Sequence, residues 1–107
     1  MNLEKVLELY ENLEEFLQKY GDNSVLQSYK FVKRTVGILR EKGNREKKEK
    51  QAIYCYKALF QDRGGLSEFY VWDNNFEIRK SINDTFEEIH KELWMILKEH
   101  PQHPVCK

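Results

Sequence analysis

The sequence predicts an all-α fold, an antiparallel bundle of about four helices with one long ordered loop at 61–75. Composition is the first reason, because 107 residues with only five glycines and two prolines favour helices over strands and turns. Periodicity is the second, because apolar residues recur at intervals of three and four in separate stretches. We expect one helical domain at 1–100 and a C-terminal tail at 101–107.

The first predicted helix covers 2–20 and stops at Gly21, because glycine enters the left-handed conformation of a helix C-terminus without penalty. A second helix follows, in which Ser24 and Gln27 have the spacing of a capping box. Gly37 inside this helix indicates close packing or a bend. The second helix ends at Gly43-Asn44. The apolar stripe of the first helix contains Leu3, Val6, Leu7, Tyr10, Leu13, Phe16, Leu17 and Tyr20.

The third predicted helix begins with the wholly charged run 45–50 and becomes apolar only from Ala52 onward. Its first turns should therefore project into water, while its C-terminal half packs on the bundle. The fourth helix covers about 76–99, since Pro101 prevents continuation. Its apolar stripe contains Ile78, Ile82, Phe86, Ile89, Leu93 and Ile96.

The segment between the last two helices interrupts the helical patterns with Gly64-Gly65 and four consecutive apolar residues at 69–72. A long connection this aromatic is typical of an ordered, functional loop. The alternative is a short strand that pairs with another chain, since all four residues favour sheets.

Successive side chains of an extended segment point to opposite sides, so the four apolar residues cannot all face inward. We expect Phe69 and Val71 to face the core, with Tyr70 and Trp72 at the surface beside Asp73. Tyrosine and tryptophan are enriched at binding hot spots. The alternative is that Trp72 caps the open end of the bundle and Tyr70 covers it.

Charge and targeting signals restrict the function classes. The net charge is zero, which argues against a general nucleic-acid binder. The balance is nevertheless uneven, because the middle of the chain is basic and both ends are acidic. The N-terminal residues do not resemble a signal peptide, and no apolar run could span a membrane. With no disulfide framework expected from Cys55 and Cys106, the sequence predicts a cytoplasmic protein without a membrane partner.

No set of residues forms a defensible catalytic or cofactor motif. Glu87 and His90 share one helical face, but a di-iron bundle needs two such pairs. His100, His103 and Cys106 are better interpreted as a solvated tail than as zinc ligands. We therefore expect a non-enzymatic protein with no catalytic residues, no metal and no cofactor.

A resemblance suggests a function. The order of the helices and the run Gly64-Gly65-Leu66-Ser67 before the last helix resemble a group of small bacterial domains over about 3–97. Those domains have a Gly-Gly loop at this place and look like immunity proteins encoded beside antibacterial toxins. The resemblance implies a contact-dependent inhibition immunity protein that binds and neutralises a cognate toxin domain, such as a nuclease.

The partner-binding residues expected from these patterns lie on the acidic faces of the first and fourth helices and in the aromatic loop. They are Glu8, Glu11, Glu14, Glu15, Gly64, Gly65, Tyr70, Trp72, Asp73, Glu87, Glu88 and Glu92. The alternative function is a small regulatory or adaptor bundle that binds nucleic acid through the basic 30–50 region. Glutamates interleaved in that region make nucleic acid the less favoured partner.

Overall fold

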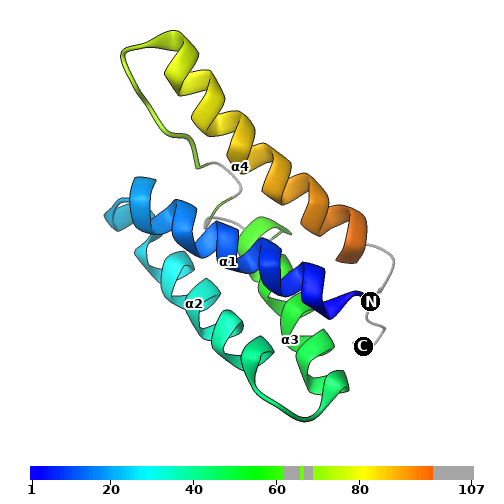
Figure 1. Cartoon of the computed structure of the whole chain (residues 1–107). Helices are drawn as coiled ribbons and strands as arrows, with labels where there is room; N and C mark the ends of the chain where they lie inside the picture. Colours follow the sequence, from blue (N-terminus) through cyan, green and yellow to red (C-terminus); the bar gives the residue numbers. More distant parts are fainter. Residues whose placement is uncertain (62–65, 67–68, 98–107) are drawn as a thin grey trace.

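A computed structural model describes residues 1–61, 66 and 69–97. These residues form four α-helices and no strand, which confirms the predicted all-α class (Figure 1). A 3₁₀ turn precedes the second helix and a π-helical turn follows the third. In chain order the elements are α1 (Leu3–Tyr20), η1 (Asn23–Val25), α2 (Leu26–Arg40), α3 (Arg45–Tyr56), η2 (Lys57–Gln61) and α4 (Phe76–Leu97).

The core lies around α1, which contacts each of the other three α-helices. Tyr10 of α1 is fully buried, and its hydroxyl donates a hydrogen bond of 2.7 Å to the carbonyl of Ala52 in α3. Such a bond satisfies two groups that would be costly to bury alone. The largest fully buried apolar side chains come from α1, η2, the turn at residue 66 and α4, and they are Leu9, Leu13, Leu59, Leu66 and Leu93.

Gly21 ends α1 for a different reason from the one predicted. Its backbone is extended, with φ −73°, and not left-handed. A Cβ atom at this position would lie 2.5 Å from the carbonyl oxygen of Leu17 and 3.0 Å from the side chain of Val25. Glycine is therefore needed because the chain turns tightly against the last turn of α1, not because of its φ angle.

The start and the interior of α2 also differ from the prediction. Asp22, rather than Ser24, caps the preceding turn η1, because its carboxylate accepts a bond from the backbone N–H of Ser24, and α2 itself begins after Val25 without a side-chain cap. A Cβ atom at Gly37 would meet nothing within 4 Å, so the predicted close packing there is wrong. The helix ends at Arg40, earlier than Gly43, whose φ of +127° favours glycine in the following turn.

The first turns of α3 are exposed and its later residues are buried, as predicted. The side chain of Asn44 accepts a bond from the backbone N–H of Lys47 and satisfies one free donor at the helix start. Ala52 and Ile53 then pack in the core.

Helix α4 extends past the other helices at its N-terminal end (Figure 1). Ile78, assigned to the apolar stripe from its spacing, is 49% exposed because no helix covers this overhanging part. Further along, the stripe packs in the core through Phe86, Ile89, Leu93 and Leu97. The predicted last turn at 98–99 and the tail at 101–107 lie outside the described residues. No described helix is both long enough and apolar enough to cross a membrane.

Candidate functional site

Residues 69–72 alternate between the core and the surface, as predicted. Phe69 and Val71 are half-buried and pack on the core, where the Phe69 ring lies edge-on to Phe86 at 5.6 Å between ring centres. Tyr70 is 58% exposed and Trp72 is 69% exposed, so Trp72 does not cap the bundle. These four residues are not in a strand.

Asn83 of α4 fixes this segment against the helix. Its side-chain oxygen accepts a bond of 2.9 Å from the backbone N–H of Val71, and its amide nitrogen donates a bond of 2.8 Å to the carbonyl of Val71. One amide therefore satisfies both backbone groups of Val71. In the following turn, the carboxylate of Asp73 accepts a bond from the backbone N–H of Asn75.

Arg79 joins two exposed rings at the same end of the molecule. Its guanidinium lies 4.2 Å from the ring centre of Trp72 and 5.3 Å from that of Phe76, distances typical of cation–π contacts. Phe76, the first residue of α4, is 61% exposed. We call Tyr70, Trp72 and Phe76 together the aromatic end.

Sequence reasoning missed three contributors to this surface, namely Phe76, Arg79 and Asn83. Phe76 could have been identified from the sequence, because it directly follows the loop and lies off the apolar stripe of the helix. Arg79 and Asn83 could not, since a polar residue on a helix is ordinarily solvated.

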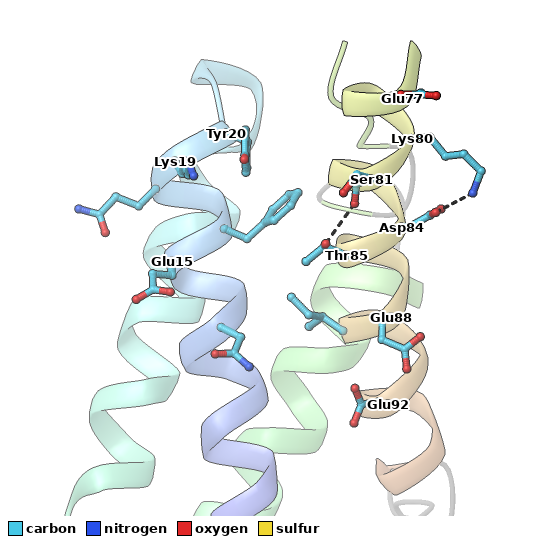
Figure 2. Close-up of a pocket in the computed structure, with 14 residues that line it drawn as sticks. Glu15, Lys19, Tyr20, Glu77, Lys80, Ser81, Asp84, Thr85, Glu88 and Glu92 are labelled. Carbon is cyan, nitrogen blue, oxygen red and sulfur yellow. Dashed lines mark hydrogen bonds and ion pairs between the residues drawn. The ribbon is translucent and has the colours of Figure 1, made fainter. Parts of the chain in front are cut away.

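An open groove of about 1100 Å³ lies between α1 and α4. Phe16, Tyr20 and Ile89 supply its apolar surface, and Figure 2 shows Ser81 and Thr85 of α4 pointing toward α1. We call it the α1–α4 groove. The lining residues are Asn12, Glu15, Phe16, Gln18, Lys19, Tyr20, Glu77, Lys80, Ser81, Asp84, Thr85, Glu88, Ile89 and Glu92.

Three of the predicted acidic residues line this groove, namely Glu15, Glu88 and Glu92. Lys5, on the same side of α1, lies 3.3 Å from a carboxylate oxygen of Glu8 and 3.6 Å from one of Glu92.

The other predicted residues are dispersed. Glu11 forms an ion pair with Arg40 of α2 at 2.7 Å, and Glu14 does not line the groove. Glu87 lies beside His90, along another face of α4. Asp73 is half-buried in the turn before α4. Gly64 and Gly65 lie outside the described residues.

His90 lies at the edge of the core. Its ring stacks on Phe60 at 4.1 Å, and its Nε2 atom lies 3.2 Å from the hydroxyl of Tyr56. Burial lowers the pKa of His90, and the charge of Glu87 acts in the opposite direction. Among the described residues, no three His, Cys, Asp or Glu side chains are grouped to hold a metal ion.

The basic 30–50 region presents a surface between α2 and α3. Lys30 and Arg34 line a shallow hollow with Tyr54, which is 63% exposed. The ring of Tyr54 rests edge-on against Phe31 at 5.6 Å. Within the part of the chain that the structure describes, Lys30 and Arg34 form no ion pair, so their charges face solvent.

The described residues thus form a small all-α domain with an exposed aromatic end and an acidic groove between two helices. The chain belongs to the YPL277C C-terminal domain family, whose model matches residues 1–104. No curated protein and no solved structure matched the chain.

This family is a yeast protein family, so the inferred resemblance to bacterial contact-dependent immunity proteins is wrong. The resemblance depended on Gly64, Gly65 and Ser67, and a glycine pair marks turns in unrelated proteins. The helix order could not correct the error, because unrelated bundles share it. The bacterial toxin partner was implied by that resemblance alone.

Proposed function

We propose that this protein is a non-enzymatic protein-interaction domain that contacts its partner through the aromatic end. The observation that carries the proposal is the exposure of Tyr70, Trp72 and Phe76 on a backbone held in place by hydrogen bonds. Large aromatic side chains are the residues most enriched at binding hot spots.

The hydrogen bonds and ring contacts that position this surface favour binding. Asn83 holds Val71, the residue between Tyr70 and Trp72, and Arg79 holds the rings of Trp72 and Phe76 by their faces. Binding costs less when side chains and backbone are already ordered, because less conformational entropy is lost. The carbonyl of Asp73 also accepts a bond of 3.3 Å from Arg79, which couples the guanidinium to the loop.

A pair of matched variants tests this proposal. The full chain is used as bait in cells of its source organism, beside the double variants Trp72→Ser/Phe76→Ser and Leu26→Ser/Met95→Ser. Leu26 and Met95 are also exposed apolar residues, but they belong to the start of α2 and to the C-terminal part of α4. We expect a partner that binds the wild type and the control and is recovered roughly 30-fold less by the Trp72/Phe76 variant. The same partners on all three baits would refute the proposal.

A second candidate function is binding of single-stranded nucleic acid at the surface around Tyr54. Exposed lysine and arginine beside an exposed ring is the arrangement that such proteins use, because bases stack on the ring while cations contact phosphates. Lys30, Arg34 and Tyr54 supply these groups. Fluorescence anisotropy with a labelled single-stranded oligonucleotide tests it.

Under this second candidate, binding at about 50 mM salt should weaken steeply as salt is added, and Tyr54→Ala and Arg34→Gln should each reduce it. Lys91→Gln, on α4, is the control that removes one exposed charge elsewhere. A chain that stays unbound at about 50 mM salt would exclude this function.

A further inference from the structure

We propose that the α1–α4 groove binds a basic amphipathic helix from another protein. The groove is a second surface with its own evidence, and it does not depend on the aromatic end. It lies between two helices, and its lining combines an apolar interior with a local excess of negative charge.

The negative charge of the groove indicates that the partner is positively charged. Five acidic and two basic side chains line it, whereas the whole chain has no net charge. Both lysines are engaged, since Lys80 forms an ion pair of 2.7 Å with Asp84 and Lys19 lies over the ring of Tyr20. Of the five acids that line the groove, Glu15, Glu77 and Glu88 form no ion pair with another described residue.

The apolar interior specifies an amphipathic partner. Phe16 and Ile89 are buried at the base of the groove, and the half-buried Tyr20 extends this surface toward the open end. Carboxylates on the rim would meet lysine or arginine, while the base would take leucine-like side chains. This combination of rim and base is complementary to a helix with one basic and one apolar face.

The walls favour a helix over an extended peptide. An extended peptide leaves its backbone N–H and C=O groups to be satisfied by its host, as on a sheet edge. The walls of this groove are the helices α1 and α4, whose backbone groups are already paired within each helix. A helical partner satisfies its own backbone and packs alongside both walls, as helices do in a bundle.

The length of the groove sets the length of the partner. Its lining on α4 runs from Glu77 to Glu92, which spans roughly 24 Å at the rise of an α-helix. On α1 it runs from Asn12 to Tyr20, where the groove is bounded on both sides (Figure 2). A partner helix of roughly 16 residues, about four turns, would cover this length.

A designed peptide tests this proposal with the full chain. The probe is a Leu/Lys peptide of about 18 residues with leucines at i, i+3, i+4 and i+7, labelled for anisotropy. Its control has the same composition with leucines at alternate positions, which favours a strand. We expect binding of the helical probe, with NMR shift changes concentrated at Glu15, Ser81, Thr85 and Glu88 of the labelled protein.

Variants of the groove assign the site. Glu15→Gln/Glu88→Gln should weaken binding of the probe roughly three- to tenfold, whereas Glu4→Gln/Glu41→Gln should change it by less than about twofold. Glu4 and Glu41 are exposed acids outside the groove. Thr85→Arg, at an exposed position on the α4 wall, should block the groove and reduce affinity at least about tenfold without unfolding the protein.

Three results would overturn the proposal. The first is equal binding of the alternating peptide, and the second is an equal effect of Glu4→Gln/Glu41→Gln. The third is concentration-dependent self-association that shifts the same groove residues, because it would assign the groove to a second copy of the chain. Trp72→Ser/Phe76→Ser should leave probe binding unchanged. A negative result for the groove can therefore be told apart from a negative result for the aromatic end.

Discussion

Replacing Asn83 by alanine should release the 69–72 segment from α4 while leaving the core intact. The substitution removes two hydrogen bonds to Val71, of 2.9 and 2.8 Å. A hydrogen bond contributes about 0.5–1.5 kcal/mol net, and water can reach the half-buried Val71 once the amide is gone. We therefore expect the free energy of unfolding to fall by about 1–2 kcal/mol. For a domain of this size that lowers the Tm by roughly 4–8 °C.

Two measurements check this expectation together. Urea denaturation gives the free energy of unfolding, and NMR hydrogen exchange gives the protection of the Val71 amide proton. Protection at Val71 should be lost in Asn83→Ala at conditions where the amides of buried α1 residues remain protected. Asn74→Ala is the matched control, since Asn74 is exposed and makes no side-chain hydrogen bond to a described residue. An unchanged Val71 exchange rate in Asn83→Ala would refute the assignment of these bonds.

Three further predictions follow from buried polar groups. Tyr10→Phe should lower the free energy of unfolding by about 1–2 kcal/mol, because the carbonyl of Ala52 loses its buried donor. Stability should fall as pH drops below about 6.5, since burial lowers the pKa of His90 in the folded chain and the unfolded chain takes up the proton first. His90→Gln should reduce that fall. Burial raises the pKa of Cys55 to about 11, so thiol reagents at pH 8 should modify it only as fast as the protein opens.

Each of these three predictions has its own control. Tyr29→Phe removes a hydroxyl from a half-buried ring and should leave stability nearly unchanged, so an equal loss would contradict the role of Tyr10. Urea midpoints that do not vary between pH 5 and 7.5 in the wild type would contradict the expectation for His90. Cys106→Ser isolates the reaction of Cys55, and rapid modification of the native variant would contradict its burial.

The helical period of the apolar residues, and the alternation of side chains in an extended segment, were enough to predict the parts of the fold that depend on neighbouring residues. The stripe of α1 and the buried second half of α3 follow from a helical period, and the core-facing placement of the half-buried Phe69 and Val71 follows from alternation. Each of these patterns indicates which side of an element is apolar. None of them indicates whether another element covers that side.

The parts that could not be predicted depend on the relative placement of elements. Ile78 fits the apolar stripe, but it is exposed because α4 runs past its neighbours. The bond between Asn83 and Val71 joins positions twelve residues apart. A polar residue on a helix and an apolar residue in a loop do not by themselves indicate such a bond. The acidic residues Glu15 and Glu88 line one groove only because α1 and α4 lie side by side. No local pattern records that arrangement.

The overhang of α4 has a consequence for how the molecule unfolds. The turns around Phe76 and Arg79 rest on the loop and lack the helical neighbours that surround Leu93. A region with few buried contacts opens at a lower free energy than the core, as a separate cooperative unit. The two ends of α4 should therefore belong to different units of one helix. A ligand bound at the overhang would stabilise the weaker unit first and bring its opening energy toward that of the whole domain.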